Sequence, residues 1–234
     1  MTELIVAPSP AELARQAADW LARELAGAIA ARGSCALGLA GGRTPEPVYR
    51  ALVSDSRIAW SRVDVFFSDE RAVPPDDPES NYRMVRLALI SRVPIPPGQV
   101  HRMEAERPDR DAAALEYERI LPQPLDVLLL GMGPDGHTAS LFPGAAALDE
   151  RDRRVVPVVG AKAPAERLTI TPPVIEAART VGVIATGEDK AAMVARAVEG
   201  AVTPKAVPAR LARRGVWLLD QAAAARLTAR RAAP

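Results

Sequence analysis

The chain has 234 residues, 48% of them hydrophobic, enough for one domain with a sizeable apolar core. Thirty basic and twenty-nine acidic residues leave a formal net charge of +1, which argues against a dedicated nucleic-acid binder. No segment approaches the roughly 18 consecutive apolar residues of a membrane span, and the lone Cys35 has no disulfide partner. We therefore predict a single domain spanning residues 1–234, in the cytoplasm, with no nucleic-acid or membrane partner.

The first predicted element is a long helix that starts after residues 4–7. Ser9 and Glu12 form the pattern of a capping box, in which both side chains accept hydrogen bonds from free amides at a helix start. Pro10 suits the first helical position. Apolar residues then recur at helical spacing as far as Ile29, which predicts an amphipathic helix.

Short apolar runs follow and alternate with helical stretches. Runs such as residues 127–130 lack the alternation of a half-solvated strand, which favours a sheet covered by helices on both faces. The predicted fold is an open, mostly parallel, Rossmann-like α/β sheet, and its ligands should bind beyond the carboxyl ends of the strands. The predicted strands are residues 35–39, 63–67, 127–130, 155–159, 168–171, 181–185 and 216–219.

The first loop at such an end contains Gly41, Gly42, Arg43 and Thr44, followed by Pro45 at the start of a helix. Glycines let backbone amides approach an anion, and a helix N-terminus adds partial positive charge. A phosphate cradle is therefore reasonable, with Arg43 as a possible ionic contact. The alternative is that the two glycines only make a tight turn.

The second loop places Asp69, Glu70 and Arg71 in a row directly after a strand. Three adjacent charges at that place are costly unless they are solvated or functional. Arg71 can hold an anion or a developing oxyanion, and Asp69 or Glu70 can hydrogen-bond sugar hydroxyls. A surface ion-pair cluster is the alternative, and Ser80 is predicted to cap the next helix.

The third loop, residues 131–144, carries His137 among three spaced glycines. A histidine there can shuttle protons near neutral pH, and Asp135 can orient its imidazole. Ser140 lacks a nucleophile-elbow sequence and is expected to cap or pack. His101, in a polar loop, is expected to be structural, and the histidines and cysteine have no recognisable metal-ligand spacing, so we expect no metal.

Five segments together closely resemble the 6-phosphogluconolactonase family, and the resemblance covers most of the chain. The resemblance implies a fold like that of phosphosugar isomerases and lactonases. It also implies hydrolysis of 6-phospho-D-glucono-1,5-lactone to 6-phospho-D-gluconate in the pentose phosphate pathway, without cofactor or metal. The segments are GLAGGRTP at 38–45, DVFFSDERAVPPDDPESNYRM at 64–84, DVLLLGMGPDGHTASLFPG at 126–144, RLTITPPVI at 167–175 and ATGEDKA at 185–191.

The resemblance also implies residue roles. His137 would be the general base that activates water, and Arg71 or backbone amides would stabilise the oxyanion. Ala40 and Arg43 stand where family members commonly carry small hydroxyl residues, which puts the phosphate contacts of that loop in question. The phosphate would contact Gly41, Gly42, Arg43, Thr44, Arg167 and Lys190.

Two of these phosphate contacts have plainer alternatives. Thr186 and Asp189 predict a helix start, which would place Lys190 in the first turn beside an anion site. Lys190 could equally be an ordinary exposed lysine. Arg167, assigned to the phosphate by the resemblance alone, could be a charge at the edge of a sheet.

Two other functions remain open at this point. A glucosamine-6-phosphate deaminase would share the fold and the Gly-His loop, but it usually has a glutamate after the histidine, where this chain has residues 140–143 without an acid. A non-catalytic sugar-phosphate sensor would need a DNA-binding module, for which the chain has no room. The expected partner is a small-molecule phosphosugar lactone, and the expected assembly is a monomer or small homo-oligomer.

Overall fold

A parallel sheet of six strands forms the centre of the computed structural model, which describes residues 2–161 and 163–228. Every neighbouring pair in the sheet is parallel, in the order β1-β9-β8-β5-β2-β3. The strands are β1 (Glu3–Ala7), β2 (Cys35–Leu39), β3 (Val63–Phe67), β5 (Val127–Gly131), β8 (Thr180–Ala185) and β9 (Val216–Asp220).

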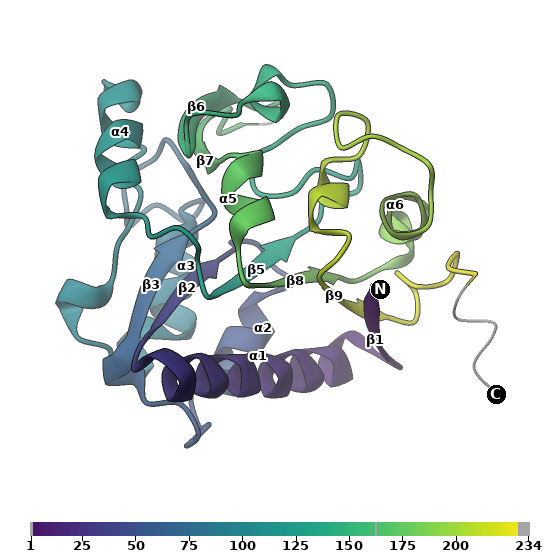
Figure 1. Cartoon of the computed structure of the whole chain (residues 1–234), viewed down its shortest axis with the longest axis horizontal. Helices are drawn as coiled ribbons and strands as arrows, with labels where there is room; N and C mark the ends of the chain where they lie inside the picture. The colour runs from purple at the N-terminus through teal and green to yellow at the C-terminus, as the bar shows by residue number, and fades with distance from the viewer. Residues whose placement is uncertain (1, 162, 229–234) are drawn as a thin grey trace.

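Helices cover both faces of this sheet (Figure 1). The long helix α1 (Pro10–Arg32) runs along one face with α2 (Glu46–Leu52), and α5 (Pro172–Ala177) and α6 (Ala191–Val198) lie on the other. Two further helices are α3 (Asn81–Ala88), which packs against α2, and α4 (Arg110–Ile120). The predicted open α/β sheet with helices on both faces is confirmed.

Helix α1 begins and ends as its sequence suggests. The Ser9 hydroxyl accepts the Glu12 amide at 3.2 Å, and Gly33 ends the helix in the left-handed region with φ of 81°. The Glu12 carboxylate accepts hydrogen bonds from Arg15 and Gln16. Among the described residues, only the serine half of the predicted capping box forms.

The core lies on both sides of β5. Leu128, Leu129 and Leu130 are fully buried, and burial of each leucine contributes about 1.5–3 kcal/mol. Cys35 on β2 is also buried, which raises the pKa of its thiol to about 12 and leaves the thiol protonated and unreactive near neutral pH.

No helix within the described residues is both long enough and apolar enough to cross a membrane.

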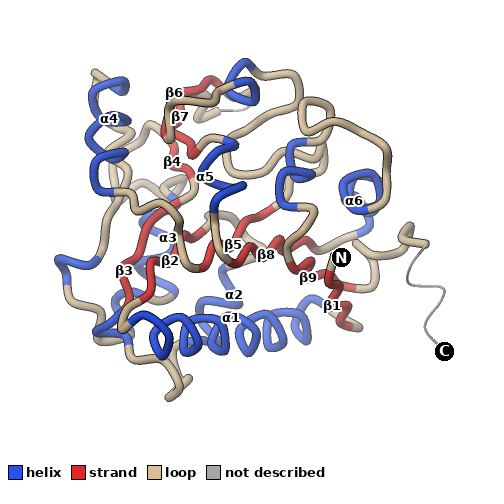
Figure 2. Tube along the Cα trace, in the orientation of Figure 1, coloured by secondary structure: helices blue, strands red, loops and turns tan. Residues whose placement is uncertain are grey.

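Three strands lie outside the main sheet and form a small antiparallel sheet of their own, β4-β7-β6 (Figure 2). They are β4 (Asp69–Arg71), β7 (Glu166–Ile170) and β6 (Val155–Val159). The prediction that residues 155–159 and 168–171 belong to one largely parallel sheet is wrong for these two runs. Residues 160–165 are too few for the crossover of a dozen or more residues that a parallel pair needs.

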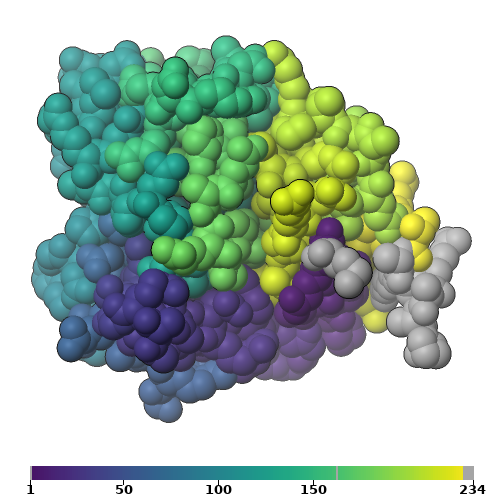
Figure 3. All heavy atoms as spheres, in the orientation of Figure 1, coloured from purple at the N-terminus to yellow at the C-terminus, as the bar shows by residue number. Residues whose placement is uncertain are grey.

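Two short strands, β4 and β1, are not among the strands predicted from the sequence. β1 pairs along its whole length with β9, from Glu3 opposite Val216 to Ala7 opposite Asp220. In the space-filling view the purple N-terminal residues lie directly against the yellow C-terminal ones (Figure 3). The edge of the main sheet therefore joins segments that are far apart in the sequence.

Candidate active site

A cleft of about 590 Å³ opens at the carboxyl edge of the main sheet. Its walls come from the loops after β2, β5 and β8 and from strands β4 and β7, and its volume is within the usual range for small-molecule sites. Two of the predicted site residues, Glu70 and Asp135, do not line it. The predicted site residues that do are Gly41, Gly42, Arg43, Thr44, Asp69, Arg71, His137, Arg167 and Lys190.

His137 is held by an aspartate on its own loop. Its Nδ1 lies 2.5 Å from Oδ1 of Asp135, and the same oxygen accepts the His137 amide at 3.2 Å. Burial raises the pKa of Asp135, but attraction to His137 and its hydrogen bonds outweigh burial, and the net pKa is lowered. Asp135 thus fixes the orientation of the His137 ring. When Nδ1–H of His137 donates to Asp135, Nε2 is the nitrogen without a proton and can act as a base.

The glycines of the β5 loop let the imidazole fit. A Cβ on Gly133 would lie 2.0 Å from Cε1 of His137, which no real contact permits. Gly136 has φ of 85°, in the left-handed region that favours glycine. The glycine pattern of this loop therefore serves the placement of His137, and the ring centroid of Phe142 lies 5.1 Å from that of His137.

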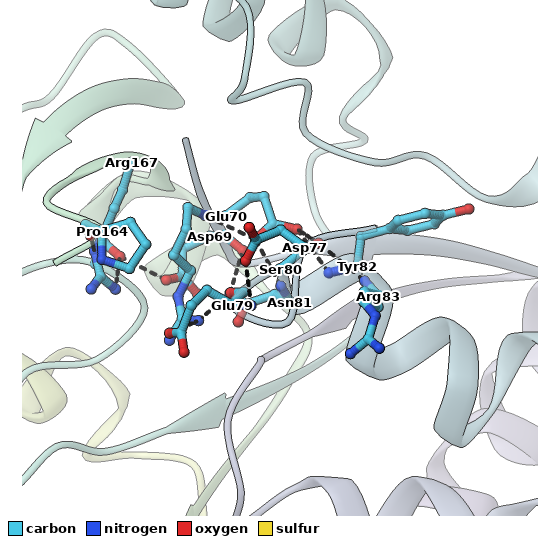
Figure 4. A network of polar contacts seen from close by, with 12 residues as sticks. Asp69, Glu70, Asp77, Glu79, Ser80, Asn81, Tyr82, Arg83, Pro164 and Arg167 are labelled. Atoms are coloured by element: carbon cyan, nitrogen blue, oxygen red, sulfur yellow. Dashed lines mark hydrogen bonds and ion pairs between the residues drawn. The ribbon is translucent and has the colours of Figure 1, made fainter. Parts of the chain in front are cut away.

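Alternation along β4 separates its three charged residues. Asp69 and Arg71 face the cleft, whereas Glu70 points to the other face and is 3% exposed. Its carboxylate accepts hydrogen bonds from the amides of Asn81 and Tyr82, both at 2.8 Å, at the start of α3 (Figure 4). The expectation that Glu70 binds sugar hydroxyls is therefore corrected: Glu70 holds the N-terminus of a helix.

Electrostatics agree with this structural role of Glu70. Burial raises the pKa of the carboxyl, and the backbone amides that bind its charged form oppose that rise. The hydroxyl of Ser80 donates to the same carboxylate at 3.0 Å and accepts the Arg83 amide, as the helix cap predicted from the sequence.

Asp69 joins the second sheet to the histidine loop. It is 6% exposed and accepts hydrogen bonds from the hydroxyls of Ser68 at 3.1 Å and Ser140 at 2.6 Å. The Ser140 amide donates to Oγ1 of Thr169 on β7 at 3.1 Å. Ser140 is thus a buried link between these segments, which agrees with the expectation that it packs.

The β2 loop and the segment after β8 meet at the other end of the cleft. Oγ1 of Thr44 lies 3.2 Å from Oγ1 of Thr186, and Gly42 has φ of 98°. Lys190 is half-buried, and its pKa is lowered by burial and by Arg43, while Asp189 and Asp220 act in the opposite direction. Lys190 ends a short 3₁₀ turn, Glu188–Lys190, and directly precedes α6, one position before the predicted first turn.

Three polar residues of the cleft were not among the predicted site residues. Thr186 and Asp189 served only as helix-start signals, and Asn81 was not considered, yet all three line the cleft. The Asn81 side chain fills the space beside Gly41 and donates to the Asp69 carbonyl at 2.9 Å. The lack of a Cβ at Gly41 is the one sequence signal of this contact.

Arg167 lies on β7, directly opposite Arg71 on β4 in the strand register. Its Nη1 is 3.5 Å from Oγ of Ser140, and its guanidinium carbon lies 5.7 Å from the ring centroid of Phe142. Burial, followed by the charge of Arg71, lowers the pKa of Arg167. Arg167 is therefore on the same wall as Arg71.

The remaining histidine lies outside the cleft. Nε2 of His101 is 3.0 Å from Oδ1 of Asp64, and its ring stacks on Phe66 with centroids 4.5 Å apart. Across residues 2–161 and 163–228, no group of three or more His, Cys, Asp or Glu side chains is placed to hold a metal ion.

A family model described as glucosamine-6-phosphate isomerases/6-phosphogluconolactonase matches residues 8–219. The chain is 40% identical over 246 residues to a 6-phosphogluconolactonase of Streptomyces coelicolor, covering 96% of this chain and 94% of the relative. It is 44% identical over 218 residues to one of Mycobacterium tuberculosis, covering 86% and 88%.

Solved structures agree with these relatives. A 6-phosphogluconolactonase from Trypanosoma cruzi superposes with a TM-score of 0.85 at 29% identity, covering 97% of both chains. A monomeric glucosamine-6-phosphate deaminase superposes with a TM-score of 0.83 at 22% identity, covering 96% of this chain and 99% of the other. At that identity the likeness to the deaminase shows a shared fold alone.

Proposed function

Because the chain belongs to the family of glucosamine-6-phosphate isomerases and 6-phosphogluconolactonases, we propose that its cleft hydrolyses a phosphosugar lactone. The chain is a lactone-hydrolysing enzyme of the pentose phosphate pathway that converts 6-phospho-D-glucono-1,5-lactone into 6-phospho-D-gluconate. The observation that carries the mechanism is the His137–Asp135 pair at the carboxyl edge of the sheet.

In the proposed mechanism, Nε2 of His137 removes a proton from a water molecule as its oxygen attacks the lactone carbonyl carbon C1. Asp135 accepts a hydrogen bond from Nδ1–H and stabilises the imidazolium that forms. The tetrahedral intermediate then collapses: the bond between C1 and the ring oxygen breaks, and that oxygen receives the proton from His137. The new carboxylic acid ionises to solvent.

Negative charge builds on the carbonyl oxygen during the attack. Arg71, which lines the cleft, and the amides of the glycine loop after β5 are the groups proposed to stabilise that charge. Asp69 is proposed to accept a hydrogen bond from a sugar hydroxyl, because Asp69 lines the cleft.

The phosphate is assigned to the other end of the cleft. Gly41 and Gly42 offer backbone amides before α2, and Arg43 and Lys190 contribute positive charge. The contact between Thr44 and Thr186 joins the two loops that carry these groups. Arg43 lines the cleft, which favours its direct contact with phosphate over an orientation to solvent.

No specific observation supports either of the two other functions, the glucosamine-6-phosphate deaminase and the sugar-phosphate sensor. The deaminase is a fold neighbour only, and residues 140–143, where an acid is expected after the histidine of a deaminase, contain none. The curated relatives bear the name of an enzyme, 6-phosphogluconolactonase, which argues against a sensor.

Five further properties of the protein remain proposals. They are the cytoplasmic location, the single domain, the monomeric or small homo-oligomeric state, the lack of a nucleic-acid partner, and the independence of metal and cofactor.

The decisive experiment measures release of 6-phosphogluconate from freshly prepared lactone in a chelating buffer, with spontaneous hydrolysis subtracted. His137→Ala should lower kcat by about 10²–10⁴-fold, because a general base contributes that much, and should change the Kd of 6-phosphogluconate little. His101→Ala is the matched control and should retain wild-type kcat. Wild-type turnover in His137→Ala would refute the base assignment, and no turnover by folded wild-type protein would refute the function.

A further inference from the structure

A buried carboxylate lies behind the lysine end of the cleft and has no part in the proposed mechanism. Asp220, the last residue of β9, is 3% exposed and is not among the residues that line the cleft. A carboxylate at such depth is costly unless hydrogen bonds or a nearby cation compensate its charge. The contacts of Asp220 therefore indicate its role.

Both oxygens of Asp220 hold the backbone of the loop after β8. The Gly187 amide donates to Oδ1 at 3.1 Å and to Oδ2 at 3.2 Å. The strand register brings these groups together, because Ala185 on β8 lies opposite Leu219 on β9 and the two strands reach the carboxyl edge of the sheet side by side (Figure 1). Asp220 thus fixes the peptide bond between Thr186 and Gly187.

The held glycine lies between two residues that line the cleft. Thr186 directly precedes Gly187, and its Oγ1 lies 3.2 Å from Oγ1 of Thr44. Lys190 follows, and its amide donates to the Gly187 carbonyl at 3.3 Å. Gly187 has φ of 95°, in the left-handed region that favours glycine. The positions of Thr186 and Lys190 therefore depend on one glycine, whose amide Asp220 holds.

Asp220 also adds a negative charge near Lys190. Burial lowers the pKa of this half-buried lysine, Asp189 and Asp220 oppose that change, and Arg43 adds to it. Within residues 2–161 and 163–228 the ammonium group forms no ion pair or hydrogen bond, so its N–H donors are available to an anionic ligand. The two aspartates thus favour the charged lysine without occupying its donors.

We propose that Asp220 is a positioning residue for the phosphate of the substrate. It holds the Gly187 amide and supplies a negative charge near Lys190, and it does not itself touch the substrate. This inference rests on the proposed function, which assigns the phosphate to this end of the cleft. Asp220 is not a hydrogen-bond partner of His137 or Asp135. Its loss should therefore weaken binding more than it slows turnover.

A plainer role for Asp220 is to close the turn that follows β9. Its Oδ1 also accepts the Ala223 amide at 2.7 Å, and a carboxylate with this task alone would affect only stability. Asp126 is a matched control for such an effect. Its side chain is 13% exposed, and its Oδ2 accepts the Ala36 amide at 2.9 Å, directly before β5 at the edge of the sheet opposite the cleft.

The affinity for 6-phosphogluconate, measured by calorimetry, tests the inference. Asp220→Ala should raise the Kd of this ligand and the KM of the lactone by about 10-fold, roughly the effect of losing one hydrogen bond to a charged group. Its kcat should stay within about 3-fold of wild type. Asp126→Ala should lower the Tm and leave Kd and KM within about 2-fold of wild type. An unchanged Kd in Asp220→Ala, or an equal rise in both variants, would overturn the inference.

A double variant tests whether Asp220 acts through the loop that carries the lysine. In a Lys190→Ala background, Asp220→Ala should weaken 6-phosphogluconate by less than about 3-fold, because substitutions in one connected unit are not additive. A second loss of about 10-fold in this background would mean that Asp220 acts elsewhere, and the inference would be wrong.

Asp220→Asn separates the charge from the hydrogen bonds and provides a variant that should fold. Asparagine can accept both amides through Oδ1, so the Tm and the Kd at pH 7 should stay near wild type. Lys190 loses a nearby negative charge, so its pKa should fall and 6-phosphogluconate should dissociate about half a pH unit earlier as the pH rises. An unchanged pH dependence would overturn the electrostatic part of the inference. If wild-type protein did not bind 6-phosphogluconate at all, the proposed function itself would fail, which is a distinct result.

Discussion

The two histidines of this chain have nearly the same surroundings and different places in the fold. His137 is paired with Asp135 at 2.5 Å and lies against Phe142. His101 is paired with Asp64 at 3.0 Å and stacks on Phe66. A histidine, a carboxylate and an aromatic ring therefore do not by themselves identify an active site.

Position and orientation make the difference. His101 bonds its aspartate through Nε2, beside the edge strand β3, and does not line the cleft. His137 bonds its aspartate through Nδ1 and follows β5, near the middle of the sheet, where ligands of open α/β sheets bind. Each of the following predictions changes a member of one of the two pairs or a glycine near it.

After replacement of the catalytic histidine itself, the largest effect is expected from the aspartates. Asp135→Asn should lower kcat by about 10–100-fold, because an amide cannot accept the Nδ1 proton as a carboxylate does and the ring loses its fixed tautomer. Asp64→Asn should leave kcat within about 2-fold of wild type, since the pair it disrupts does not touch the cleft. Steady-state hydrolysis of the lactone measures both, and an equal loss in the two variants would remove the distinction between the pairs.

A smaller effect is expected from the glycines near each histidine. Gly133→Ala places a Cβ 2.0 Å from the His137 ring and should lower kcat by about 10-fold by displacing the imidazole. Gly98→Ala, three residues before His101, meets no heavy atom within 4 Å and should be silent. The kcat of both variants is the measurement, and wild-type kcat in Gly133→Ala would show that the ring position is not critical.

The structural histidine should matter for stability instead. His101→Ala should lower the free energy of unfolding by about 1–2 kcal/mol, through loss of a hydrogen bond and of a stacked ring. Its kcat should not change. Urea denaturation gives the stability, and a variant as stable as wild type would show that the His101–Asp64 pair contributes nothing to the fold.

The smallest effect concerns pH. Because the folded-state pKa of Asp135 is lowered, its stabilising contribution is present above the unfolded pKa of about 3.9 and is lost as pH falls through the folded value. The side chain is half exposed, so the gain is a few tenths of a kcal/mol, roughly the worth of a surface ion pair. The difference in Tm between wild type and Asp135→Asn should shrink below about pH 4; a constant difference down to pH 3 would contradict this.

The sequence was sufficient to predict five of the six strands of the main sheet and the loops that form the cleft. Continuous apolar runs such as residues 127–130 locate buried parallel strands, and the residues after them lie at one edge of the sheet. Because residues that follow parallel strands share one edge of the sheet, we expected Gly42, Asp69 and His137, from three separate segments, to lie near one another. All three line one cleft.

What the sequence could not predict depends on strand register and on contacts between distant segments. β4 has three residues, so the alternation that turns Glu70 away from Asp69 and Arg71 has no periodic signal. The pairing of Arg71 with Arg167 is set by the register of β4 and β7. The contact between Thr44 and Thr186 spans 142 positions, and no local pattern encodes it.

The pairing of β1 with β9 has a consequence for the order of folding. Val216–Asp220 is synthesised after every other strand of the main sheet, so Glu3–Ala7 has no strand partner until those residues have emerged from the ribosome, and such distant contacts form slowly. The last residue of β9, Asp220, also holds the Gly187 amide. The lysine end of the cleft is therefore completed only when this late strand docks, after the histidine loop has already been synthesised.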